Sequence, residues 1–370
     1  MTHRIPPRIY RYIRSDGVVC LCLCLCLCLV LLFGLFSYFG QPTISKSQTN
    51  PVIVGNPHAT CQRNGYVANQ TYSYSLSVER TQRRYLVHTP AEPNFGIGNP
   101  TEPRPVVVAF GGKGMSQRTF EQVSQLNQLP ALIVYPQPLL GKYHQRAWQG
   151  APYSNQANDI AFVKQVLREV KARFCVNTEA IYSVGFSNGG GFSWLLSCTA
   201  SQEFRAFAMV AGAYYYPESK CKPAVRRSIM SIHGQRDMAV PYKGSKKRHL
   251  PAVENWAMRR AMANRCRPLK PQEQYLSRGV TSQIWENCAN HTSVINLTLR
   301  NAGHRWPLLT SYVTPDVVST GEIQTTTQFI WDFFTSTQYL DQSLQPGEIL
   351  QLSMSLRRYR ETLYLPEDSY

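Results

Sequence analysis

Residues 181–196 read IYSVGFSNGGGFSWLL: an apolar run, a glycine-rich turn and a second apolar run. At its centre, Gly185-Phe186-Ser187-Asn188-Gly189 matches the pattern G-x-S-x-G. Between a strand and a helix, this pattern is typical of a sharp, strained turn that holds a serine hydroxyl out over the end of a sheet. The stretch therefore predicts a strand–turn–helix unit with Ser187 as a nucleophile.

Strand and helix patterns alternate on both sides of this turn. Alternating polar and apolar residues predict a hairpin over residues 72–78 and 83–88, and helical spacing predicts helices over 160–170 and 323–334. Further strands are expected over 106–110, 131–135, 181–186, 206–210, 228–233 and 294–299. This order predicts an α/β fold of the α/β-hydrolase type, with a mostly parallel sheet covered by helices on both faces.

A serine nucleophile needs a base, and the base needs a third group to orient it. In this fold the order along the chain is serine, acid, histidine, with the partners on loops that follow strands. Between Ser187 and His304 the only aspartate is Asp237, four residues past a predicted strand, and His304 itself follows the strand 294–299. We therefore expect a Ser187–His304–Asp237 triad. The fallback acids are Glu203, Glu218, Glu254, Glu273 and Glu286. The two other histidines after Asp237, His249 and His291, are expected to be solvent-exposed and not part of the triad.

Two backbone N–H groups are candidates for stabilising a developing oxyanion. Asn188 begins the helix after the serine, where the helix dipole is positive. The second donor is expected in the glycine-rich loop after residues 106–110, at Gly112 or Lys113. Among the aromatic residues, Trp148 and Tyr153 are candidates for lining an aromatic acyl pocket, with ordinary core packing as the alternative. The sequence predicts neither a metal site nor a cofactor.

The first forty residues are typical of a targeting segment. Four arginines precede a long apolar run over residues 17–39, long enough as a helix to cross a bilayer. A cleaved signal peptide and a retained signal-anchor are both open, and either predicts export of the rest of the chain. The expected organisation is a targeting segment over 1–40, a linker over 41–70, a catalytic domain over 71–336 and a tail over 337–370.

The chain is strongly basic, with a formal net charge of +17. Residues 1–40 contribute four arginines and one aspartate, a net +3, so the rest carries about +14. This charge favours anionic surfaces such as acidic polysaccharides, lipid headgroups or nucleic acid, although a solvated basic surface without a partner is the preferred interpretation. The lack of a nucleic-acid-binding motif argues against nucleic acid. The expected partner is an ester substrate, with membrane contact only through residues 17–39 if these are retained.

Cysteine usage also predicts export. Five of the eleven cysteines lie in the apolar run, and six remain for up to three disulfides: Cys61, Cys175, Cys198, Cys221, Cys266 and Cys288. Three N-x-[ST] sequons, at Asn69, Asn290 and Asn296, are candidate glycosylation sites.

The chain resembles secreted fungal ferulic acid esterases within the wider poly(3-hydroxybutyrate) depolymerase/feruloyl esterase group. Matching stretches lie at 134–137 (VYPQ), 148–153 (WQGAPY), 158–162 (NDIAF), 185–192 (GFSNGGGF), 233–242 (HGQRDMAVPY) and 303–307 (GHRWP). One departure is Phe110-Gly111, where the group usually has His-Gly.

The resemblance implies a metal-free α/β-hydrolase that frees hydroxycinnamic acids from plant cell-wall polysaccharide. It carries the catalytic roles onto Ser187, Asp237 and His304. It also implies the disulfides Cys175–Cys198 and Cys266–Cys288, which leaves Cys61–Cys221. The rival interpretations are an acetyl-xylan esterase or polyhydroxyalkanoate depolymerase with the same triad, and a non-catalytic wall-binding protein on a hydrolase fold.

Overall fold

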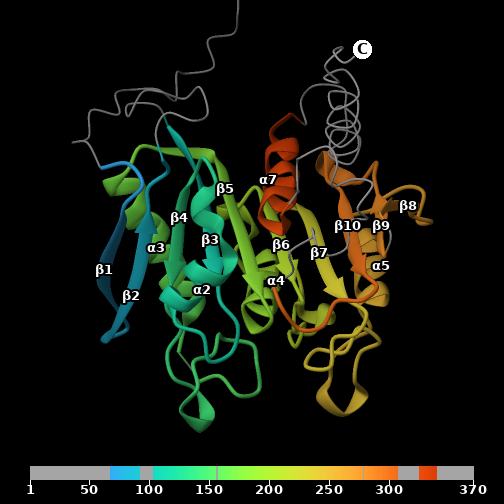
Figure 1. Ribbon diagram of the computed structural model, residues 1–370, viewed down its shortest axis with the longest axis horizontal. Coiled ribbons are helices and arrows are strands. Elements are labelled where there is room, and N and C mark those ends of the chain that lie inside the picture. Colours follow the sequence, from blue (N-terminus) through green and yellow to red (C-terminus); the bar gives the residue numbers. More distant parts are fainter. Residues whose placement is uncertain (1–66, 92–102, 156, 278, 307–324, 340–370) are drawn as a thin grey trace, which may run out of the picture. The chain divides into compact units, whose positions relative to one another are not determined.

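The computed structural model describes residues 67–91, 103–155, 157–277, 279–306 and 325–339 (Figure 1). The predicted targeting segment, most of the predicted linker and the tail from residue 340 lie outside this part of the chain. The strands are β1 (Thr71–Val78), β2 (Thr81–His88), β3 (Arg104–Phe110), β4 (Leu132–Pro136), β5 (Val176–Phe186), β6 (Ala206–Val210), β7 (Ser228–Gly234), β8 (Gln272–Ser277), β9 (Val280–Trp285) and β10 (Val294–Leu299). The α-helices are α2 (Gln117–Ser124), α3 (Asp159–Arg173), α4 (Asn188–Thr199), α5 (Val253–Ala263) and α7 (Thr326–Ser336).

All ten strands form one sheet in the order β1-β2-β4-β3-β5-β6-β7-β10-β9-β8. The six central strands, from β4 to β10, pair in parallel, and antiparallel strands close both edges. The carboxyl ends of the parallel strands all lie at the same end of the sheet, which we call its carboxyl edge, so the loops that follow these strands gather there. The predicted α/β-hydrolase fold is confirmed, including its starting hairpin.

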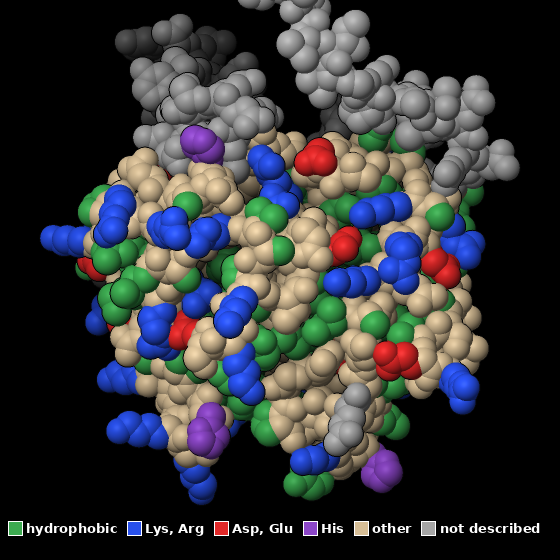
Figure 2. Space-filling view, turned by 180° about the vertical axis from the view of Figure 1, so that it is seen from behind, with side chains coloured by type: hydrophobic (Ala, Val, Ile, Leu, Met, Phe, Trp, Pro, Cys, Tyr) green, Lys and Arg blue, Asp and Glu red, His purple; other side chains and the backbone are tan. Residues whose placement is uncertain are grey.

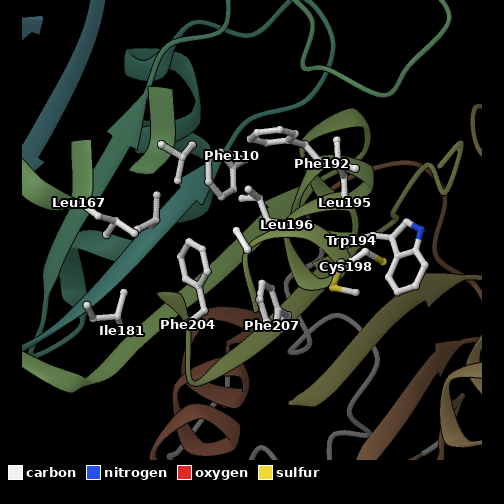
Figure 3. Close-up of a cluster of buried hydrophobic side chains, with 14 of the residues drawn as sticks. Phe110, Leu167, Ile181, Phe192, Trp194, Leu195, Leu196, Cys198, Phe204 and Phe207 are labelled. Carbon is white, nitrogen blue, oxygen red and sulfur yellow. The ribbon is translucent and has the colours of Figure 1, made fainter. Parts of the chain in front are cut away.

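Helices cover both faces of this sheet. Buried side chains of α3, α4 and α5 pack on one face, and those of α2 and α7 pack on the other. Helix α4 is buried on all sides up to Cys198, and Figure 3 shows Phe192, Trp194, Leu195 and Leu196 within the core. Such burial fixes the helix that begins directly after Ser187.

Four elements were absent from the sequence prediction: α2, α5, β8 and β9. Helix α2 has eight residues, and α5 buries Trp256 and Ala257 but exposes Met258 and Met262. Strand β8 is an edge strand whose Tyr275 side chain is exposed. Short or half-exposed elements give weak periodicity, so pattern alone does not distinguish them from loops.

Two disulfides join described residues, Cys198–Cys221 and Cys266–Cys288. The Cys266–Cys288 prediction is confirmed, whereas the predicted pairs Cys175–Cys198 and Cys61–Cys221 are wrong. The reason is the path of the chain after β6: the indole N–H of Trp194 in α4 donates to the Tyr216 carbonyl, and this contact brings the segment up to Cys221 against the end of α4. Cys175 is itself disulfide-bonded, but not to Cys198.

The three sequons differ in accessibility. Asn69 and Asn290 are exposed. Asn296 is fully buried in β10, between β7 and β9, and its amide donates to the Gln283 side chain. A glycan does not fit there in the folded protein, so the Asn296 prediction is wrong. Among the described residues, no helix is long and apolar enough to cross a membrane.

Candidate active site

The turn between β5 and α4 has a backbone conformation that few residues adopt. Ser187 has φ 55° and ψ −118°, a sparsely populated region for a residue with a side chain. A Cβ on Gly185 would lie 2.2 Å from the Gly189 carbonyl oxygen, and one on Gly189 would lie 2.0 Å from the Phe110 carbonyl oxygen. Neither position admits any other residue without moving backbone, so the two glycines make the predicted sharp turn possible.

The structure brings Ser187, His304 and Asp237 into one line of hydrogen bonds. The His304 Nδ1–H donates to Asp237 Oδ2 at 2.7 Å, and the Ser187 hydroxyl donates to His304 Nε2 at 2.9 Å. Ser187 follows β5, Asp237 follows β7 and His304 follows β10, so all three sit on loops at the carboxyl edge of the sheet. The line can move a proton from Ser187 to His304 while Asp237 stabilises the resulting imidazolium.

Asp237 is buried and fully hydrogen-bonded. Its Oδ1 accepts the backbone N–H groups of Ala239 and Val240, and its Oδ2 faces two histidines, His304 at 2.7 Å and His233 at 3.3 Å. Burial by itself would raise the pKa of Asp237. The hydrogen bonds from His233, His304 and the Val240 N–H outweigh burial and hold that pKa well below its usual value. The carboxylate is therefore ionised at any pH near neutrality.

His233 was not singled out by the sequence. Its Nε2 lies 2.9 Å from the Val240 carbonyl and 3.3 Å from Asp237 Oδ2, both acceptors, so Nε2 carries the hydrogen. The side chain is completely buried at the end of β7. Its position directly before Gly234 in the stretch 233–242 is the one signal that pointed to it. His233 fixes both the Asp237 carboxylate and the loop that bears it.

Aromatic contacts position the histidine. The Phe186 ring lies 5.0 Å from the His304 ring, and Trp306 packs edge-on against Phe186 and Phe120. The His304 side chain remains 22% exposed, whereas Asp237 is fully covered. One face of the imidazole is thus packed while its reactive edge stays open to an incoming molecule.

The expected oxyanion donors lie beside the serine. The N–H of Asn188 is the first of α4, where helix N–H groups have no partner within the helix. A Cβ on Gly112 would stand 3.2 Å from Ser187 Cβ, so the loop after β3 passes directly over the nucleophile. The Gly112 N–H faces the Met115 sulfur at 3.3 Å, a weak acceptor that a substrate oxygen can replace.

Trp148 lies elsewhere than predicted. It is fully buried and stacks on Phe192, with ring centroids 4.9 Å apart, so it cannot line a substrate pocket. Its indole N–H donates to the Gly111 carbonyl at 3.0 Å, and its backbone N–H donates to the Asn188 side chain at 2.7 Å. Trp148 therefore joins the two loops that bear the expected oxyanion donors, a role that the sequence did not indicate.

The unusual Phe110 belongs to the same core. Its ring packs edge-on against Trp148 at 5.2 Å and Phe192 at 5.1 Å. The segment that bears Trp148 is held by a buried ion pair. Arg83 Nη2 lies 2.6 Å from Asp159 Oδ1, and Asp159 Oδ2 accepts a hydrogen bond from the Gln149 N–H. The oxyanion loop is thus supported by packing and not by a histidine at position 110.

Tyr153 is half-buried near the mouth of the site. Its ring meets Tyr215 edge-on at 5.8 Å, and Lys113 Nζ lies 4.7 Å from its centroid. Burial, together with the neighbouring Tyr215, raises the pKa of Tyr153, so the phenol stays neutral. Its assignment as a substrate contact stays a prediction. Among the described residues no cluster of His, Cys, Asp or Glu side chains suits a metal.

Comparison with known proteins adds the chemical class. No family model matches the chain. It is 26% identical over 285 residues to the putative esterase NocK of Nocardia uniformis subsp. tsuyamanensis, an alignment that spans 70% of this chain and 80% of that protein. It is 28% identical over 169 residues to feruloyl esterase B of Piromyces equi, covering 43% of this chain and 31% of the relative. These relatives place the chain among the carboxylic-ester hydrolases.

A third similar protein is feruloyl esterase D of Neurospora crassa. It is 26% identical to this chain over 168 residues, which are 44% of this chain and 56% of that protein. This chain thus spans about a third of the length of feruloyl esterase B and just over half of the length of feruloyl esterase D. Among solved structures, acetyl xylan esterase from Aspergillus awamori is 11% identical with a TM-score of 0.46, over 63% of this chain and 94% of that one. The Bacillus cereus carboxylesterase is 10% identical with a TM-score of 0.41, over 71% and 95%.

Proposed function

We propose that the chain is a secreted serine esterase that releases hydroxycinnamic acids, ferulic acid among them, from plant cell-wall polysaccharide. The observation that carries the proposal is the unbroken hydrogen-bond line from Asp237 through His304 to Ser187, beside the Asn188 and Gly112 N–H groups. The feruloyl esterases among the relatives support the choice of substrate.

The reaction is a two-step acyl transfer to water. His304 Nε2 takes the Ser187 proton as Oγ attacks the ester carbonyl, and the Asn188 and Gly112 N–H groups donate to the oxyanion that forms. The oxyanion collapses to an acyl-enzyme as the C–O bond of the ester breaks, and the leaving alcohol takes the proton from His304. His304 then deprotonates a water molecule, which attacks the acyl carbon. The bond to Ser187 Oγ breaks, Oγ takes the proton back from His304, and the carboxylic acid leaves.

The acyl group is proposed to lie against Tyr153 and Tyr215. Both tyrosines are partly exposed, and the Tyr215 segment is tied to the serine because the Ala213 N–H donates to the Ser187 carbonyl at 2.9 Å. Edge-to-face and offset contacts between aromatic rings add about 0.5–1.5 kcal/mol beyond buried area. This wall would favour a hydroxycinnamoyl group over an acetyl or short hydroxyacyl group.

Export is part of the proposal. The disulfides Cys198–Cys221 and Cys266–Cys288 form and persist in oxidising compartments. Both join segments of the hydrolase fold, so the domain is suited to folding outside the cytosol. Labelling of a carboxyl-terminal epitope on intact cells, compared with its release into the medium, would distinguish a retained anchor from a cleaved signal.

The test is hydrolysis of methyl ferulate and p-nitrophenyl acetate by the disulfide-bonded chain and by Ser187→Ala. We expect the variant to lose about 10⁴-fold or more of kcat and all labelling by a fluorophosphonate. Ser197→Ala is the matched control, because its hydroxyl donates to the Trp194 carbonyl within α4 and otherwise contacts only the Cys198 sulfur, at 3.9 Å, and neither partner belongs to the triad. A wild-type preference for the acetyl ester would move the substrate to acetylated polymers, and no turnover or labelling would overturn the serine mechanism.

A further inference from the structure

The loops that surround Ser187 carry exposed cations. Each of them follows a strand of the parallel sheet: Lys113 follows β3, Lys142 follows β4, Arg248 follows β7 and Arg305 follows β10. We call Lys113, Lys142, Lys246, Lys247, Arg248 and Arg305 the rim cations; all six are exposed. Because these loops leave the edge of the sheet that also presents Ser187, the charges surround the mouth of the site.

The rim lacks compensating acids. Over residues 111–116, 137–155, 235–252 and 300–306, Asp237 is the only Asp or Glu, and it is buried and bound to two histidines. Within the described part of the chain, no rim cation forms an ion pair. Figure 2 shows an excess of Lys and Arg over Asp and Glu on one side of the molecule as well, so the basic character extends beyond the mouth. The field at the mouth is therefore positive and attracts anions.

Two of these cations are built into the wall beside the nucleophile. Lys113 Nζ lies over the Tyr153 ring at 4.7 Å, Tyr153 meets Tyr215 edge-on, and Arg248 donates to the Tyr215 hydroxyl at 3.3 Å. Arg248 is also anchored by a hydrogen bond to the Ala239 carbonyl, in the loop that bears Asp237. Tyrosine faces flanked by fixed cations thus run from the oxyanion loop to the acid loop.

We propose that the esters cleaved at this site are carried on an acidic polysaccharide that contains uronic acids. This inference deepens the proposed function and rests on it. The carboxylates of uronic acid units on either side of the esterified sugar pair with the rim cations, which are spread over four loops and so engage several units at once.

The first experiment measures binding without turnover. Fluorescent oligogalacturonates and neutral xylo-oligosaccharides of equal length are titrated with the full chain at low and at moderate ionic strength. We expect binding of the acidic oligomer only, weakened by tenfold or more on going from about 0.02 M to about 0.2 M salt, because screening shortens the reach of exposed charges. Neither oligomer carries an ester, so the result is independent of whether Ser187 is a nucleophile.

The second experiment uses two charge-matched triple variants. Lys246→Gln/Lys247→Gln/Arg248→Gln removes three rim cations, and Arg168→Gln/Lys222→Gln/Lys270→Gln removes three exposed cations on α3 and on the segments that lead into β7 and β8. We expect the rim triple to lose at least tenfold in affinity for oligogalacturonate and the control triple to stay within twofold. On feruloylated pectin, kcat/KM of the rim triple should fall at least fivefold more than on methyl ferulate.

Three outcomes would overturn the inference. The first is equal binding of the neutral and acidic oligomers, and the second is equal loss in the two triple variants. The third is binding to vesicles of anionic phospholipid without binding to oligogalacturonate, which would make the rim a membrane-facing surface. If methyl ferulate is not hydrolysed but the acidic oligomer binds through the rim, the proposed function fails while the rim remains a site for acidic polysaccharide.

Discussion

The serine and the histidine–aspartate halves of the site are held in place by different means. On the serine side the backbone is decisive: Gly185 and Gly189 allow strand, turn and helix to approach within distances that exclude a Cβ. On the other side the side chains are decisive, with His233 and the Val240 N–H bonded to Asp237 and Asp237 bonded to His304. Changes on the serine side should therefore act through folding, and changes on the other side through protonation.

The largest expected effect is Gly189→Ala. A Cβ there would lie 2.0 Å from the Phe110 carbonyl oxygen, and backbone cannot yield as a flexible side chain can. We expect the free energy of unfolding to fall by about 3 kcal/mol or more, with loss of soluble protein. Gly303→Ala is the control on the histidine side, because its Cβ would meet nothing closer than 3.9 Å. Chemical denaturation of both variants measures the free energy of unfolding. A larger loss in Gly303→Ala than in Gly189→Ala would contradict the view that the backbone is decisive on the serine side.

The next effect concerns the acid. Asp237→Asn keeps the shape but removes the charge that orients and stabilises the His304 imidazolium, so kcat should fall by about 10⁴-fold while the fold is retained. Glu254→Gln is the control, since that carboxylate accepts a hydrogen bond from Tyr242. Initial rates on p-nitrophenyl acetate separate the two, and a large loss in Glu254→Gln with a small one in Asp237→Asn would show that the acid was misassigned.

A smaller effect is expected where the two loops of the oxyanion site meet. Trp148→Phe keeps most of the stacking on Phe192 but removes the indole hydrogen bond to the Gly111 carbonyl. We expect kcat to fall about tenfold with little change in KM, because the donor positions matter mainly in the transition state. Trp256→Phe is a matched control, since the Trp256 indole N–H is buried without a hydrogen-bond partner. Equal kcat values for the two variants would argue against a role of Trp148 in holding the Gly111 and Asn188 segments in position.

The smallest effect is on acid stability. Because the pKa of Asp237 is lowered on folding, its ionised form stabilises the native state above the unfolded value of about 3.9, and this contribution is lost as pH falls below it. The difference in free energy of unfolding between the wild type and Asp237→Asn should therefore shrink as the pH falls from about 5 to about 3. Urea denaturation of both proteins across this pH range measures the difference. A difference that grew as the pH fell would contradict the prediction.

Much of the fold was predictable because its elements are strongly patterned. The strand at 206–210 was expected with the bounds that β6 has, since a buried parallel strand is an unbroken apolar run. Strand β8 was not expected, because an exposed edge strand carries little pattern. Ser187, Asp237 and His304 were expected together because each follows a strand, and the structure places His304 within hydrogen-bonding distance of both Ser187 and Asp237.

The sequence by itself thus determined which residues lie at the carboxyl edge of the sheet, since strand pattern and chain order suffice for that. Only the tertiary structure decided which residues are their neighbours. Cys198 pairs with Cys221, Asn296 is buried, and Trp148 braces two loops in place of lining a pocket. Each of these depends on how segments far apart in the chain pack against one another, and local periodicity carries no record of such packing. The ring of rim cations around Ser187 has the same origin, because its members come from four separate loops.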